Sequence, residues 1–157
     1  MDPTAQQTQD PARRAVELTR TGTGRYTARN AAGAEIAFGT GEELLSPVEL
    51  LLAALAGCSS VGVDTATSRS AQPTRFRVAA TGHEVVEEGA RRLDGLHLSF
   101  DLAFPDDDGG RKAAGLVERL IALAHDKHCT VSRTIEHGAP VGHDVAVALE
   151  DPAGREP

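Results

Sequence analysis

Two cysteines, Cys58 and Cys129, have the clearest chemical potential of the side chains in this 157-residue sequence. A deprotonated thiol is a nucleophile, a metal ligand and a site of reversible oxidation. Cys58 lies in a long apolar run, where it is either a small buried hydrophobe or, beside a cation or hydrogen-bond donor, a nucleophile. Cys129 lies where one predicted helix ends and a short helical segment begins, and backbone N–H groups at a helix start favour an anion. Each cysteine taken alone leaves both interpretations open.

Arg25, Arg29 and Glu49 are the charged side chains that could complete a thiol site. The permanent charge and forked donors of arginine suit it to holding a thiolate and a substrate oxygen. Arg25 and Arg29 lie on one predicted strand, which faces either a cleft or plain solvent. Glu49 either orients such an arginine or caps its own helix. Nine helical residues place Glu49 about 13 Å from Cys58 along the axis, so it would reach only the thiol of an antiparallel partner helix.

A metal site is an alternative use of the second cysteine. His125, His128 and Cys129 follow one another closely, and His137 is nearby in sequence. Imidazole and thiolate are zinc ligands, and histidines three positions apart share one face of a helix. The spacing matches no established zinc pattern, so we do not expect a metal site here.

The composition excludes several classes of function. The net charge is −7 with no basic block, which disfavours binding to nucleic acid or to a membrane surface. With 3% aromatic residues and no Trp, the chain lacks stacking platforms for single strands. Two cysteines separated by 71 positions form no disulfide-rich scaffold, and the N-terminus has no basic-then-apolar export signal. We expect a cytoplasmic protein with one domain over residues 13–150, and disordered tails at 1–12 and 151–157.

The hydrophobic periodicity predicts an α+β fold. Alternation favours strands, and the i, i+3, i+4 pattern of residues 111–126 favours an amphipathic helix. The expected architecture is one six-stranded antiparallel sheet with two main helices on one face. The predicted strands are 14–20, 25–30, 35–38, 75–81, 93–104 and 144–149, and the predicted helical segments are 47–68, 111–126 and 130–136.

The helix over residues 47–68 has a well-marked start and an apolar surface on every side. Ser46 suits the N-cap, Pro47 the first turn, and Glu49 the returning carboxylate of a capping box. A helix that is apolar all round is buried all round. One sheet and one further helix cannot cover all of it, so we expect an intimate homodimer in which two copies of this helix pack together.

The two cysteine segments together resemble the OsmC/Ohr family, the osmotically inducible and organic-hydroperoxide-resistance proteins. Ser46–Cys58 (SPVELLLAALAGC) is similar to the first cysteine motif of that family, and Lys127–Ile135 (KHCTVSRTI) to the second. The resemblance extends over roughly residues 13–149. It implies an intertwined α+β homodimer with two active sites between the subunits, and a thiol-dependent peroxidase without metal or organic cofactor.

The same resemblance implies a role for each site residue. Cys58 would become a sulfenic acid on attacking an organic hydroperoxide, or H₂O₂, and Cys129 would resolve it as a disulfide that an external dithiol reduces. Gly24-Arg25 best matches the context of the family's active-site arginine, with Arg29 second. The carboxylate that pairs with that arginine follows the helix-opening proline, where this chain has Val48 and places Glu49 one position later. The alternative function is a dimer that binds a small apolar or electrophilic ligand, or senses redox state.

Overall fold

A computed structural model describes residues 11–149 of the chain. It opens with an antiparallel meander of β1 (Val16–Gly22), β2 (Arg25–Asn30) and β3 (Glu35–Gly39). These strands match the predicted ones to within two residues. The predicted tails lie outside the described residues, apart from positions 11 and 12, and the limits of the domain stay a prediction.

The long helix α1 (Pro47–Thr67) begins as the sequence predicts. The hydroxyl of Ser46 accepts a hydrogen bond from the backbone N–H of Glu49 at 3.2 Å. In return, the carboxylate of Glu49 accepts one from the backbone N–H of Ser46 at 2.7 Å. This capping box is confirmed, with Pro47 in the first turn.

A long hairpin follows α1, made of β4 (Arg75–Glu87) and β5 (Ala90–Ala103). The predicted strands, 75–81 and 93–104, were too short at the tip of the hairpin. Glu88 and Gly89 both have positive φ, as the two-residue turns of tight hairpins require, and so the strands stay paired up to this turn. The strand residues next to this turn were not predicted because apolar and polar side chains do not alternate there, as the tip of the hairpin is mostly exposed.

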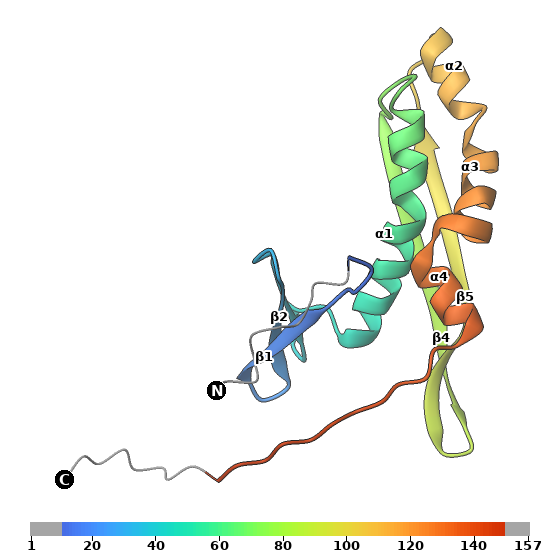
Figure 1. The fold of residues 1–157 in the computed structure, drawn as a ribbon. Helices are drawn as coiled ribbons and strands as arrows, with labels where there is room; N and C mark the ends of the chain where they lie inside the picture. The colour runs from blue at the N-terminus through green and yellow to red at the C-terminus, as the bar shows by residue number, and fades with distance from the viewer. Residues whose placement is uncertain (1–10, 150–157) are drawn as a thin grey trace.

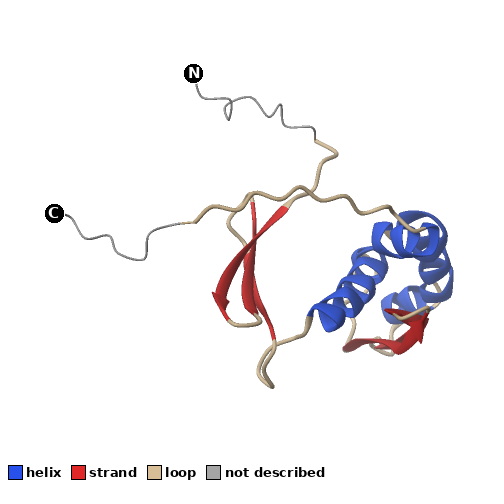
Figure 2. Cartoon of the chain, turned by 90° about the horizontal axis from the view of Figure 1, so that it is seen from below, coloured by secondary structure: helices blue, strands red, loops and turns tan. Residues whose placement is uncertain are grey.

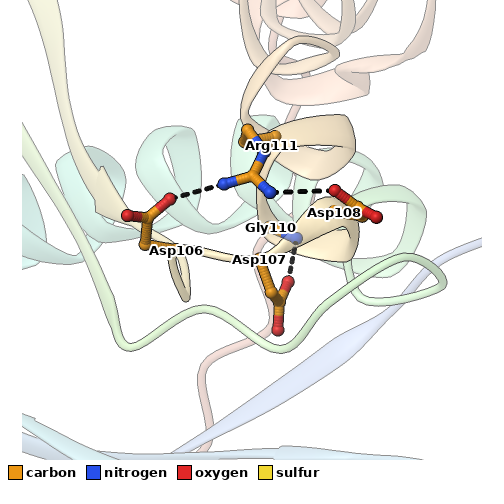
Figure 3. Close-up of polar contacts among 5 residues, drawn as sticks. All are labelled: Asp106, Asp107, Asp108, Gly110 and Arg111. Carbon is orange, nitrogen blue, oxygen red and sulfur yellow. Dashed lines mark hydrogen bonds and ion pairs between the residues drawn. The ribbon is translucent and has the colours of Figure 1, made fainter.

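The predicted helix over residues 111–126 is divided in the structure. It consists of α2 (Asp108–Ala114), α3 (Val117–Leu123) and a π-helical turn, η1 (Ala124–His128), before α4 (Thr130–His137). Asp107 starts α2 early because its carboxylate accepts a hydrogen bond from the N–H of Gly110, and Arg111 pairs with both Asp106 and Asp108 (Figure 3). Gly115 ends α2, since glycine is a poor residue for the interior of a helix.

Two sheets replace the single six-stranded sheet that we predicted. Strands β1–β3 form one sheet and β4–β5 another, with all pairs antiparallel and the helices gathered over the hairpin (Figures 1 and 2). Residues 144–149 form no strand, which corrects the last predicted element. They leave the helical layer as an extended chain that pairs with no strand of the described residues (Figure 1), and an extended segment joins a sheet only through such pairing.

The core lies along one side of α1. This helix packs against β4 and against α3, η1 and α4, and its buried residues recur every four positions. Apolar side chains of α1 are also exposed, such as Val61 away from this side and Leu51 toward the start of the helix. By length and composition α1 could also cross a membrane, a criterion that the core helix of a soluble protein meets as well. The buried residues of α1 are Leu55, Ser59, Val63 and Thr67.

Candidate active site

Cys129 is the N-cap residue of α4 and is wholly buried. Its sulfur accepts a hydrogen bond from the backbone N–H of Ser132 at 3.3 Å. The hydroxyl of Ser59, from the buried side of α1, donates a second hydrogen bond to the same sulfur at 3.3 Å. The predicted position of Cys129 at a helix start is therefore confirmed, and α1 and α4 meet at this thiol.

Cys58 lies beside Cys129, although 71 positions separate them in sequence. The Cys58 thiol is close enough to Cys129 to help lower the pKa of the Cys129 thiol, and neither cysteine is in a disulfide. Cys58 is partly exposed, whereas Cys129 lies behind it in the core. The fold thus brings together the two thiols that the sequence analysis selected, with the outer one accessible to a small molecule.

Several hydrogen bonds act on the acidity of Cys129. Burial alone would raise the pKa of this thiol, because a buried thiolate loses its hydration. Hydrogen bonds from Ser59, from the backbone of Ser132, from Cys58 and from the backbone of Val131 oppose that effect. Together they hold the pKa of Cys129 below its ordinary value.

A mostly apolar pocket of about 460 Å³ opens beside Cys58. It lies between α1 and the segment formed by α3 and η1, and apart from the Cys58 thiol its one ionisable side chain is that of His128. A hydrocarbon group would fit such a wall better than a hydrated ligand, because apolar contacts favour apolar solutes. The lining residues are Cys58, Val61, Gly62, Leu120, Leu123, Ala124 and His128.

The two candidate arginines lie away from the thiols, in the separate sheet of β1–β3 (Figure 1). Arg25 forms an ion pair with Glu43, 2.6 Å away in the loop that leads to α1. Arg29 forms an ion pair with Glu35 on the neighbouring strand. The single chain therefore places neither guanidinium at Cys58.

Glu49 lies at the start of α1 and takes part in the capping box. Hydrogen bonds from the backbone and the hydroxyl of Ser46 lower the pKa of Glu49. The structure does not bring this carboxylate to Cys58 or to Arg25. Its capping interpretation is the one that the geometry of the single chain supports.

The histidines of the metal alternative are dispersed among other contacts. The Nε2 atom of His125 lies 3.5 Å from the carboxylate of Glu136, which also accepts a hydrogen bond from the hydroxyl of Ser132. Within residues 11–149, no group of three or more His, Cys, Asp or Glu side chains is arranged to hold a metal ion. The donor geometry of this part of the chain gives the metal alternative no support.

Three residues that contact the candidate side chains were missed by the sequence analysis. Ser59 and Ser132 donate to the buried sulfur, and Glu43 pairs with Arg25. The position of Ser132, three residues after the N-cap, is the signal that could have identified it. Ser59 directly follows Cys58, but only the packing of α1 against α4 shows that it faces the other cysteine.

Comparison of the sequence with known proteins identifies similar chains over most of its length. The family model described as "OsmC-like protein" matches residues 39–144. Uncharacterized proteins of Mycobacterium bovis and Mycobacterium tuberculosis are each 30% identical over 138 residues, which cover 82% of this chain and 93% of each relative.

Solved structures share the fold at lower identity. An OsmC-like protein of unknown function from Vibrio cholerae is 16% identical with a TM-score of 0.64, over 80% of this chain and 94% of that one. An OsmC-like protein from Mycoplasma pneumoniae is 14% identical with a TM-score of 0.60, over 80% and 89%. At these identities the likeness concerns the fold alone.

Proposed function

Because the chain belongs to the OsmC-like family, we propose that it is a thiol-dependent peroxidase that reduces organic hydroperoxides with Cys58 and Cys129. The observation that carries this proposal is that the two thiols are neighbours in the fold, Cys58 partly exposed and Cys129 buried. A peroxidase of this type needs one accessible thiol to meet the peroxide and a second within bonding reach to resolve the product.

In the first step, the Cys58 thiolate attacks the terminal oxygen of the hydroperoxide. The S–O bond forms while the O–O bond breaks, and the alkoxide takes up a proton and departs as an alcohol. Cys58 is then a sulfenic acid. The apolar pocket beside Cys58 supports an organic substrate, because its walls would bury the hydrocarbon group of the peroxide.

In the second step, the Cys129 thiolate attacks the sulfur of the sulfenic acid. The S–S bond forms and hydroxide leaves, so the substrate oxygen departs as water after protonation. An external dithiol then exchanges with the disulfide and returns both cysteines to the reduced state. We infer that no metal or organic cofactor takes part, because sulfur supplies both electrons of the reduction, and that this chemistry runs in the reducing cytoplasm.

We also infer a homodimer that completes this site. The single chain exposes apolar side chains on the β1–β3 sheet, on α1 and on the extended segment 141–149, and monomeric proteins rarely expose so much apolar surface together. A second copy would cover them and could carry Arg25, held by Glu43, to the thiols of its partner. Those side chains are Val16, Leu18, Ile36, Val48, Leu51, Val61, Val141, Val145, Val147 and Leu149.

Stopped-flow oxidation by cumene hydroperoxide and by H₂O₂ tests the peroxidase. We expect no turnover from Cys58→Ser, and a sulfenic acid that persists and reacts with dimedone in Cys129→Ser. Cumene hydroperoxide should react faster than H₂O₂. If the wild type and both variants consumed peroxide at equal rates, the cysteines would not be the catalysts, and a ligand-binding or redox-sensing module would replace this proposal.

A further inference from the structure

The sulfur of Cys129 is surrounded by hydrogen-bond donors. The Ser59 hydroxyl and the Ser132 N–H each donate to it at 3.3 Å, and the nearby Cys58 thiol and Val131 backbone also favour its anionic form. A neutral thiol is a weak acceptor, whereas a thiolate is a strong one. A buried sulfur that receives several donors, at the start of a helix, is therefore an environment built for an anion.

From this geometry we propose that Cys129 is the resident thiolate of the reduced site, and that it exchanges a proton with Cys58 during peroxide reduction. Ser59 is then a positioning residue, because it acts on the reaction only through the sulfur of Cys129. This inference rests on the proposed peroxidase function. It gives Cys129 a task before disulfide formation as well as during it.

The cysteine pair supplies the proton of the first step, and solvent supplies that of the second. The Cys58 thiol first gives its proton to the Cys129 thiolate, which leaves Cys58 as the nucleophile beside the apolar pocket. When Cys58 attacks the hydroperoxide, the departing alkoxide takes that proton from Cys129 and leaves as the alcohol. Cys129 is a thiolate again and attacks the sulfenic acid, and the hydroxide that leaves is protonated by solvent.

Several titratable and charged groups lie on the elements that surround Cys129. Glu136 reaches it indirectly, since the hydroxyl of Ser132 donates to that carboxylate while the N–H of Ser132 donates to the sulfur. Glu136 also lies next to His125, which balances its charge when protonated. The groups to consider in a pH profile are Cys58 on α1, His97 on β5, His125, Lys127 and His128 on η1, and Arg133 and Glu136 on α4.

Thiolate absorbance at 240 nm, followed during a pH titration of the reduced full-length protein, tests the assignment. We expect the lowest-pH titration step to persist in Cys58→Ser and to disappear in Cys129→Ser. The reverse result would make Cys58 the resident thiolate and would overturn the proposal. This readout does not depend on peroxide turnover, so it decides the thiolate assignment even if the peroxidase function fails.

Substitutions at two adjacent serines of α1 test the positioning role. Ser59→Ala removes one donor to the thiolate and should raise the titration midpoint of Cys129 by about one pH unit. Ser60→Ala is the matched control, because the Ser60 hydroxyl donates to the carbonyl of Ala56 in its own helix. Ser59→Thr keeps the hydroxyl, so its titration midpoint should stay close to the wild-type value. Equal midpoints in Ser59→Ala and Ser60→Ala, with native circular dichroism in both, would overturn the role of Ser59.

The rate of the first oxidation tests the proton exchange. Cys129→Ser cannot take the proton, so Cys58 should form a sulfenic acid about 100-fold more slowly at neutral pH. In Ser59→Ala the pH profile of the same step should move upward together with the absorbance midpoint. Sulfenic acid formation at the wild-type rate and with the wild-type pH profile in Cys129→Ser would overturn the exchange, while the peroxidase function would stand.

Discussion

The extended segment 141–149 provides a direct test of self-association. Apolar side chains alternate along it, and that of Val147 is 84% exposed in the single chain. In a strand, alternate residues face the same side, so docking on a second copy would bury Val145, Val147 and Leu149 together. Val147→Thr keeps the branched shape at Cβ and the preference for extended backbone, but places a hydroxyl where the dimer would bury a methyl group.

The expected magnitude follows from burial and symmetry. Complete burial of a valine side chain contributes about 1.5 kcal/mol at the low end of its usual range, and most of this is lost in Val147→Thr. A two-fold dimer contains the contact twice, so the dissociation free energy should fall by about 3 kcal/mol. That corresponds to a dissociation constant roughly 100-fold weaker.

Sedimentation equilibrium over a range of protein concentrations measures this constant. Ala148→Ser is the matched control, since the next residue points to the opposite side of an extended chain and should leave the constant within about twofold. Because residues 141–149 form no strand in the single chain, both variants should keep native circular dichroism. A dissociation constant that is equal in wild type and Val147→Thr would refute the docking of this segment on a second copy.

Further predictions concern the site and its supports. Arg25→Ala should slow the oxidation of Cys58 in stopped-flow traces far more than Arg29→Ala. A larger effect of Arg29→Ala would show that Arg29, and not Arg25, is the active-site arginine. Ser46→Ala removes the N-cap of α1 and should lower the free energy of unfolding by about 1 kcal/mol, or the melting temperature by about 3 °C. Since the folded-state pKa of Cys129 is lowered, its thiolate should add stability that is complete above the pKa of an unfolded thiol, about 8.5, and is lost as the pH falls through the folded pKa. Urea unfolding under reducing conditions should therefore show a gap between wild type and Cys129→Ala that widens as the pH rises; a gap independent of pH would contradict the lowered pKa.

Much of the fold follows from local signals. The capping residues fixed the start of α1, and alternation located β1–β3 and the body of the β4–β5 hairpin. The prediction of one continuous helix over residues 111–126 was wrong, because hydrophobic periodicity alone does not show the break at Gly115 or the π-helical turn that follows α3. The predicted strand over residues 144–149 was wrong for the described chain, because a strand forms only by pairing with another strand and alternation within the segment does not show whether a partner lies beside it.

For the candidate site too, some features follow from local sequence signals and others only from the packing of the elements. The sequence by itself selected Cys58 and Cys129 as the candidate reactive residues, because their motifs and the helix start at Cys129 are local features. Only the tertiary structure decided that Ser59 serves the distant cysteine, that Glu43 rather than Glu49 holds Arg25, and that the arginine lies apart from the thiols in a single chain. Chain geometry fixes which residues can cap a helix or line a strand, but contacts between elements depend on how those elements pack, and packing is set by the whole chain.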